Sequence, residues 1–140
     1  MAETFDIEIA TPERLLAREK AIRAQIPAKE GYIGVLPDHA SLLSELGIGA
    51  MTYTTPDDRR FSLAISGGFL EIHDNVVRLL TEFAEKGHEI DVTQAEKDLK
   101  DAQNEMVNPA LGVDLAAALI AVRHAQARID AVRKAAAKEE

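Results

Sequence analysis

The chain has 140 residues, enough for one full domain or for a small domain with an appendage. Its formal net charge of -8 argues against nucleic acid or anionic lipid as a partner, because both would repel an acidic surface. It contains no cysteine, which excludes disulfides and thiolate chemistry, and it has no apolar run long enough to span a bilayer.

The N-terminal part reads as a series of short strands separated by turns. Acids alternate with apolar side chains in the first residues, a pattern that fits neither a signal peptide nor a transit peptide. Period-two alternation and regularly spaced turn residues predict an antiparallel β-sandwich or flattened barrel. The expected strands lie at 4–10, within 14–27, through Met51 and Tyr53, and at 60–65, 69–72 and 76–83, although the stretch 14–27 could also be helical.

Two glycine-containing stretches interrupt these strands. Residues 30–43, EGYIGVLPDHASLL, combine glycines, a Pro-Asp turn and a Leu-Leu pair, which predicts a rim that carries Glu30, Tyr32 and His39. Such a rim suits docking of a partner better than chemistry, although His39 could instead cap the turn. In residues 65–72, ISGGFLEI, the Ser-Gly-Gly run predicts a β-bulge rather than a ligand cradle.

After residue 88 the pattern becomes helical. Thr93, followed by Glu96, predicts the N-cap of a helix that ends at Asn108-Pro109. A second helix is expected from Leu115 to about residue 137. The expected apolar stripes are Ala95, Leu99, Ala102 and Met106 on the first helix, and Leu115, Leu119, Val122, Ile129 and Val132 on the second.

This antiparallel two-helix hairpin is rich in alanine and therefore buries little apolar area. At about 25 cal/mol per Å², its docking on the β domain should contribute only a few kcal/mol. Weak docking is what a movable element needs, and it is also what a frayed tail would show. We expect a β-sandwich domain over 1–88 and a helical-hairpin domain over 89–140.

Both glycine-containing stretches resemble motifs of one family. Residues 30–43 resemble the G-x-G-x-x-P-x-H-x-x-L-L signature in the N-terminal domain of the ATP synthase epsilon subunit, and residues 65–72 resemble its S-G-G-x-x-E motif. The resemblance implies a non-catalytic rotor subunit of a proton-translocating F-type ATP synthase, which couples the gamma shaft to the membrane c-ring. It also implies a peripheral position on the cytoplasmic face of the bacterial inner membrane, without insertion.

The resemblance assigns roles to residues of the rim and the hairpin. The resemblance implies that Glu30, Tyr32 and His39 bind gamma and the c-ring. The hairpin would lie on the sandwich or extend along gamma toward the catalytic alpha and beta subunits, where it would inhibit hydrolysis. Its basic groups could make inhibitory contacts or simply form a solvated helix face; they are Arg123, Arg128, Arg133 and Lys134.

Several bacterial members of this family bind ATP on the folded hairpin through an I/L-D-x-x-R-A motif. In this chain the motif falls at 90–95, where Gln94 replaces the arginine, and a further family arginine falls at Asp101. Losing a cation and gaining an anion predicts weak or absent ATP binding, because phosphate contacts are charge-assisted. The vestigial site would comprise Glu85, Ile90, Asp91 and Arg128. No other cofactor is expected.

Two other function classes stay open at this point. The first is a free-standing β-sandwich adaptor with a helical tail for another partner. The second is a metal-dependent enzyme, which some β-sandwich folds support. The four histidines, His39, His73, His88 and His124, show no metal-ligand spacing, and no nucleophile or phosphate-loop motif is present. We therefore expect neither a metal site nor catalytic residues.

Overall fold

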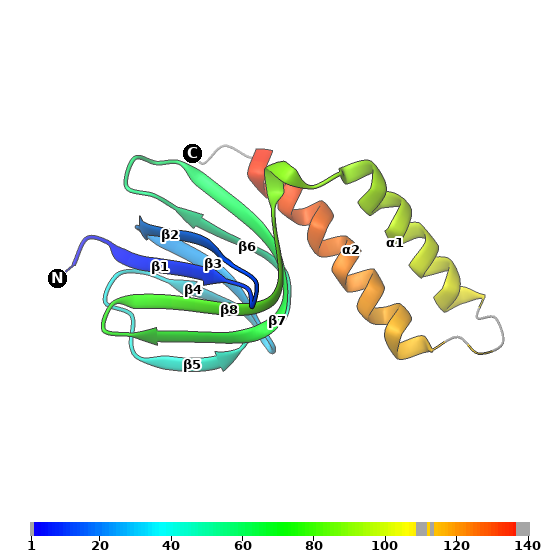
Figure 1. Ribbon diagram of the computed structural model, residues 1–140, viewed down its shortest axis with the longest axis horizontal. Helices are drawn as coiled ribbons and strands as arrows, with labels where there is room; N and C mark the ends of the chain where they lie inside the picture. Colours follow the sequence, from blue (N-terminus) through cyan, green and yellow to red (C-terminus); the bar gives the residue numbers. More distant parts are fainter. Residues whose placement is uncertain (1, 109–111, 113, 137–140) are drawn as a thin grey trace.

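The computed structural model describes residues 2–108, 112 and 114–136. In this part of the chain, strands fill the N-terminal region and two helices form a hairpin after it (Figure 1). The strands are β1 (Phe5–Ala10), β2 (Leu15–Ala21), β3 (Arg23–Ala28), β4 (Gly31–Val35), β5 (Leu42–Glu45), β6 (Ile48–Thr54), β7 (Arg60–His73) and β8 (Val76–Lys86). The helices are η1, a short 3-10 helix (Gly87–Glu89), α1 (Val92–Val107) and α2 (Leu115–Ala136).

The strands form one continuous sheet that curves into two layers. Its order is β2-β1-β8-β7-β6-β3-β4, with β5 paired to β7 beside β6, and its two end strands do not pair with each other in the described residues. Long β7 and β8 curve from one layer into the other and close one end of the sandwich (Figure 1). The predicted β-sandwich followed by a helical hairpin is confirmed, although the sheet is open rather than a closed barrel.

One strand pair departs from the antiparallel prediction. β1 runs parallel to β8, with Ile7 opposite Val77, whereas the other strand pairs are antiparallel. These two strands lie at opposite ends of the β domain in the sequence. Period-two alternation identifies a strand and its buried face but not its neighbour, so the parallel pair could not be predicted.

The core lies between the two layers and follows the alternation of the sequence. Phe5, Ile7 and Ile9 of β1 are all at most 1% exposed, and their acidic neighbours face outward. Side chains of both layers complete the core, among them Ile26, Met51, Leu63, Ile65, Leu70, Ile72 and Leu79. Burial of this set stabilises the domain mainly through the hydrophobic effect.

The Ser-Gly-Gly run does not interrupt β7. Ser66 pairs with Phe83 and Gly68 pairs with Thr81, so the register is the same on both sides and no residue is inserted. The predicted β-bulge is therefore wrong at this position. Gly67 and Gly68 instead have φ values of 75° and 109°, which lets the strand bend without a register shift. The Thr81 hydroxyl supports the bend from 2.7 Å away, where it donates to the Gly67 carbonyl.

The helices begin and end close to the predicted positions, with one correction. Asp91, not Thr93, is the N-cap of α1, because its side chain accepts a hydrogen bond from the Gln94 backbone N–H at 3.1 Å. Asn108 caps the C-terminus, as predicted. Asp114 caps α2 by accepting from backbone N–H groups of the first turn. The predicted end of the second helix at 137 lies outside the described residues, and no described helix is long and apolar enough to cross a membrane.

Alanines, rather than large apolar residues, form the buried stripe of the hairpin. Leu115 and Leu119 are 52% and 39% exposed, and Met106 is 40% exposed, so their predicted burial is wrong. Ile129 is buried as predicted. The remaining buried positions are Ala95 and Ala102 on α1, and Ala118, Ala125, Ala127 and Ala131 on α2. Small side chains let the helix backbones approach closely, which leaves the larger ones at the edges of the contact.

Candidate functional site

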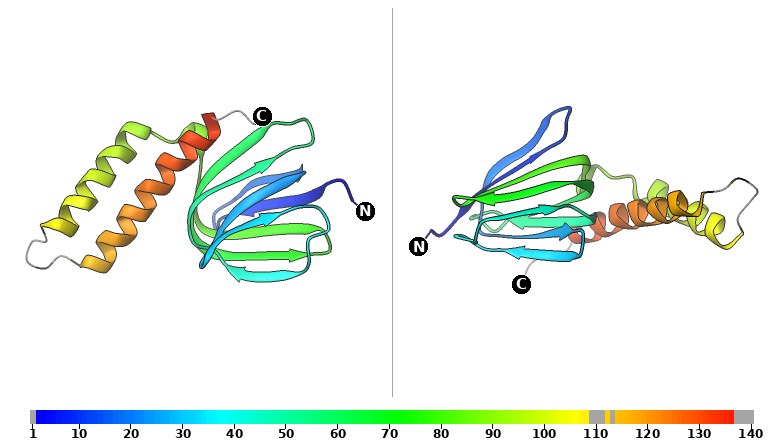
Figure 2. Two further views of the ribbon diagram at one scale, coloured as in Figure 1. Left: turned by 180° about the vertical axis from the view of Figure 1, so that it is seen from behind. Right: turned by 90° about the horizontal axis from the view of Figure 1, so that it is seen from below.

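The hairpin contacts the β domain through α2, whereas α1 packs on α2 (Figure 2). Four alanines form the centre of this contact, and each is at most 3% exposed: Ala50 of β6, Ala64 of β7, and Ala127 and Ala131 of α2. Partly buried Ile48, Phe83 and Ile90 pack around them. We call this contact the hairpin dock.

Backbone groups of α2 approach the sheet closely at the middle of the dock. The Ser62 hydroxyl of β7 donates to the Ala131 carbonyl at 2.5 Å. A Cβ atom on Gly87 would lie 2.7 Å from the same carbonyl oxygen, so only glycine fits at this point of η1. The Ser62–Ala131 hydrogen bond and the space left by Gly87 therefore fix the position of α2 along the sheet.

Arg128 of α2 contacts both β8 and α1. Its Nε and Nη2 donate to the two carboxylate oxygens of Glu85 on β8, at 2.8 and 3.3 Å. Its Nη1 lies 3.6 Å from a carboxylate oxygen of Asp98 on α1. The Arg128 side chain is only 16% exposed and that of Glu85 is 26% exposed, so water screens the pair weakly. Bidentate geometry makes this the strongest polar contact between hairpin and sheet.

Lys134 makes a second polar contact near the end of α2. Its Nζ donates to the Ala50 carbonyl at 3.1 Å and lies 4.7 Å from the centre of the Tyr32 ring. The Tyr32 hydroxyl oxygen accepts a hydrogen bond from the Ala50 backbone N–H at 3.1 Å. Tyr32 of β4 is thus attached to both β6 and α2.

His124 is half-buried in the dock. Its ring meets Phe83 edge to face, with 4.5 Å between centroids. Burial lowers the pKa of His124 below its ordinary value of 6.5, and the Arg128 guanidinium lowers it further, whereas Glu85 and Asp98 act in the opposite direction. Neutral His124 is therefore the form that suits the docked hairpin.

We expect acidification to weaken the dock. A released hairpin exposes His124, which then binds a proton near its ordinary pKa of 6.5, while the docked form binds that proton less readily. The contribution of His124 is therefore complete above pH 6.5 and decreases as the pH falls below it. Amide hydrogen exchange in α2, measured between about pH 5.5 and 7.5 and corrected for the intrinsic rate, should show this loss. A His124→Phe variant keeps a ring against Phe83, and an equal pH dependence in this variant would contradict the assignment.

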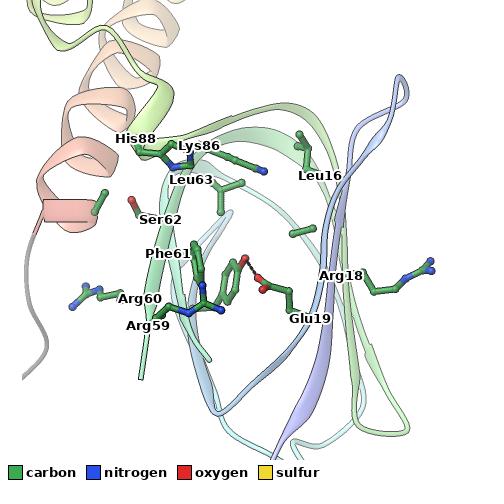
Figure 3. A pocket seen from close by; sticks show the side chains of 13 residues that line it. Leu16, Arg18, Glu19, Arg59, Arg60, Phe61, Ser62, Leu63, Lys86 and His88 are labelled. Atoms are coloured by element: carbon green, nitrogen blue, oxygen red, sulfur yellow. Dashed lines mark hydrogen bonds between the residues drawn. The ribbon is translucent and has the colours of Figure 1, made fainter. Parts of the chain in front are cut away.

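A cavity of about 560 Å³ opens between β2 and the start of β7 (Figure 3). Several of the polar and charged groups that line it already have partners. The Tyr53 hydroxyl donates to Glu19 inside it, and burial together with this bond raises the pKa of Tyr53. Arg59 binds Asp57 at 2.8 Å, and Arg18 points away from the cavity. We therefore place the candidate site at the hairpin dock rather than here.

Comparison with known proteins identifies the family. The family model described as ATP synthase, Delta/Epsilon chain, beta-sandwich domain matches residues 4–87. The ATP synthase epsilon chain of Solibacter usitatus is 48% identical over 129 residues, which cover 92% of this chain and 96% of that one. The epsilon chain of Syntrophomonas wolfei is 40% identical over 135 residues, covering 96% and 98%. The chain belongs to the ATP synthase epsilon-chain family.

Two solved structures share the fold with this epsilon-family chain. A chain in the cryo-EM structure of the Euglena gracilis mitochondrial ATP synthase, OSCP/F1/c-ring, superposes with a TM-score of 0.82 at 24% identity, covering 94% of this chain and 83% of that one. A chain of the Tetrahymena thermophila mitochondrial ATP synthase central stalk and c-ring gives 0.54 at 17% identity, covering 94% and 96%. The family predicted from the two motifs is confirmed, and a free-standing adaptor is not favoured.

The structure separates the residues predicted to dock on the rotor. Glu30 is exposed just before β4, and Tyr32, 49% exposed, lies near the start of that strand beside the dock. His39 follows β4 at its other end, where its Nδ1 lies 2.7 Å from the Ala40 carbonyl oxygen. Most of β4 thus separates Glu30 and Tyr32 from His39, so the three do not form one cluster. Their roles in docking stay predictions.

The basic residues of α2 divide into two groups. Arg123 and Arg133 are exposed, whereas Arg128 and Lys134 contact the β domain. Of the residues predicted to form a vestigial ATP site, Glu85 and Arg128 bind each other, Asp91 caps α1 and Ile90 packs at the dock. No group of three metal-ligating side chains lies together in the described residues.

Sequence reasoning missed Asp98 and Ser62 as members of the dock. Gln94, at the position of the lost arginine, donates to Asp98 at 2.8 Å. Asp98 follows Gln94 by one helical turn, so the pair could have been found from its i,i+4 spacing. Nothing in the local sequence marks Ser62, because its partner, the Ala131 carbonyl, is a backbone group far along the chain.

Proposed function

We propose that this epsilon-family chain is the rotor-coupling subunit of a bacterial ATP synthase, without catalysis of its own. Residues 1–88 would bind the gamma shaft and the membrane ring, and residues 89–140 would form a hairpin that regulates hydrolysis through the catalytic alpha and beta subunits. The complex would hold the chain peripherally on the cytoplasmic face of the inner membrane. Family membership supports the assignment, and a surface feature of the β domain supports the docking role.

An exposed apolar cluster lies on one outer face of the β domain. Leu43 of β5, Phe69 of β7 and Leu80 of β8 are 74%, 56% and 63% exposed. Phe69 lies opposite Leu80 in the β7–β8 pair, and Leu43 is diagonal to Phe69 across the β5–β7 pair, so the three adjoin. Adjoining exposed apolar side chains indicate a protein-binding surface, and this observation carries the proposal that gamma binds here.

A pull-down with purified gamma subunit tests the proposal. We expect the wild-type chain to bind and Phe69→Ser to lose about tenfold or more in affinity, the usual effect of removing a central aromatic anchor. Leu36→Ser is the matched control, because Leu36 is 63% exposed but lies just beyond β4, away from the cluster. Equal binding of the two variants would contradict gamma docking at this face.

We also propose that the hairpin docks without ATP and that the chain binds ATP weakly or not at all. The resemblance predicts that Arg128 contacts a bound nucleotide. In the structure its guanidinium instead lies between two carboxylates, that of Asp98 on the hairpin and that of Glu85 on β8. The Asp98 carboxylate of the hairpin thus takes the place of a nucleotide phosphate beside the Arg128 guanidinium. A triphosphate would have to displace Asp98 and approach Asp101, whose carboxylate binds Lys97 at 2.8 Å.

Isothermal titration with ATP tests this reading. We expect no heat of binding at micromolar nucleotide in the wild-type chain. The double variant Gln94→Arg with Asp98→Asn restores one cation and removes one anion, so it should gain affinity for ATP, because each phosphate contact is charge-assisted. Micromolar affinity in the wild-type chain would overturn the proposal.

A further inference from the structure

Tyr32 belongs to two surfaces at once. One side of its ring faces the Lys134 ammonium of α2, and its hydroxyl oxygen accepts from the Ala50 N–H of β6. The side chain is nevertheless 49% exposed, so much of it remains open to a partner while the hairpin is docked. Tyr32 therefore contacts the hairpin and is also one of the residues that the resemblance assigns to docking on gamma and the c-ring.

The surroundings specify this conformation of Tyr32. A Cβ atom on Gly49 would lie 2.6 Å from the Tyr32 hydroxyl oxygen, so glycine leaves the space in which the phenol sits. Lys134 completes the arrangement from the other side, since its Nζ binds the Ala50 carbonyl at 3.1 Å and meets the ring at 4.7 Å. Ala50 thus binds Tyr32 through its N–H and Lys134 through its carbonyl.

We propose that Lys134 makes the docked hairpin preorganise Tyr32 for the partner at the rim. Release of the hairpin removes the ammonium from the ring and frees the Tyr32 side chain to leave its place on β6. A partner that binds Tyr32 in the held conformation then binds the docked form better. Because such coupling is reciprocal, the same partner favours the docked hairpin. The identity of the partner rests on the proposed function, whereas the link between Lys134 and Tyr32 does not.

The link can be measured in the isolated full-length chain by NMR of ring-labelled tyrosine. The chain has only two tyrosines, Tyr32 and Tyr53, so the signals are readily assigned. Lys134→Met should free the Tyr32 side chain to sample several conformations. The Tyr32 ring signals should therefore shift toward an average over these conformations, while those of Tyr53 stay unchanged. Arg133→Met is the matched control, because Arg133 is adjacent but exposed. Tyr32 signals that are the same in the two variants would overturn the proposal.

A second variant acts at a distance from Tyr32. Arg128→Ala removes the bond of α2 to Glu85 and leaves Lys134 and Tyr32 intact. If the hairpin holds Tyr32, its release by this substitution should change the Tyr32 signals in the same direction as Lys134→Met. Amide exchange of α2 in the same samples reports how far the hairpin has been released. A released hairpin with unchanged Tyr32 signals would also overturn the link.

Binding to the purified c-ring separates the link from the proposed docking role. We expect Tyr32→Leu to weaken ring binding and Lys134→Met to weaken it by about two- to fivefold, the range of an exposed cation–π contact. A loss in Tyr32→Leu without any loss in Lys134→Met contradicts preorganisation but preserves docking at the rim. Full ring binding by Tyr32→Leu contradicts the docking role of Tyr32, while the NMR result still decides the link.

Discussion

Replacement of Arg128 by alanine is expected to release the hairpin from the β domain. The substitution removes two charge-assisted hydrogen bonds to Glu85 and the approach to Asp98, and it leaves the Glu85 carboxylate only 26% exposed without its cation. A hydrogen bond to a charged group contributes about 1.5–3 kcal/mol, so loss of this pair should shift the docking equilibrium by at least about tenfold. The apolar part of the dock centres on four alanines, and we expect this contact alone to be too weak to hold the hairpin.

The release can be followed by the distance between spin labels, one on the exposed face of α1 and one on β1. Arg123→Ala is the matched control, because Arg123 is an exposed arginine on the same helix. In the double variant Arg128→Ala with Glu85→Ala, part of the loss should be recovered, since no buried carboxylate is then left unpaired. A hairpin that stays docked in Arg128→Ala would show that the alanine contact alone holds it.

The sequence predicts the β domain well because its signals are local. Alternation over 4–10 identifies a strand and its buried face, and β1 indeed buries Phe5, Ile7 and Ile9. Pairing is not local, so the parallel contact of β1 with β8 could be seen only in the structure. At Gly67-Gly68 the same residue types suit a bulge or a bend, and only the register distinguishes them.

The dock was predicted less well because its contacts are tertiary. Arg128 and Glu85 could be named from the family resemblance, and the structure brings them together. Helical periodicity favours large apolar residues as the buried ones, whereas close approach of the backbones selects alanine, as at Ala131. Lys134 and Tyr32 were assigned to different partners, and no sequence signal shows that they meet.

Gly68→Ala is expected to destabilise the β domain more than any other glycine substitution at a strand position. Its φ is 109°, and a Cβ atom there would lie 2.0 Å from the Leu80 carbonyl oxygen and 2.7 Å from the Thr81 Cα. Both obstacles are backbone atoms of the paired strand, so the clash can be relieved only by moving β7 away from β8. Backbone strain and the clash together should cost about 4 kcal/mol or more, measured as the free energy of unfolding in urea.

Gly31→Ala separates the two causes of that loss. Gly31 has a φ of 137°, but a Cβ atom there would meet nothing within 4 Å. Gly31→Ala therefore introduces backbone strain without a clash, and this strain should lower the free energy of unfolding by about 1–2 kcal/mol. If the clash at Gly68 dominates, the difference between the variants should be at least about 2 kcal/mol. Equal losses would mean that β7 and β8 can separate at the bend at little cost, and the bend would then be a flexible joint rather than a fixed corner of the domain.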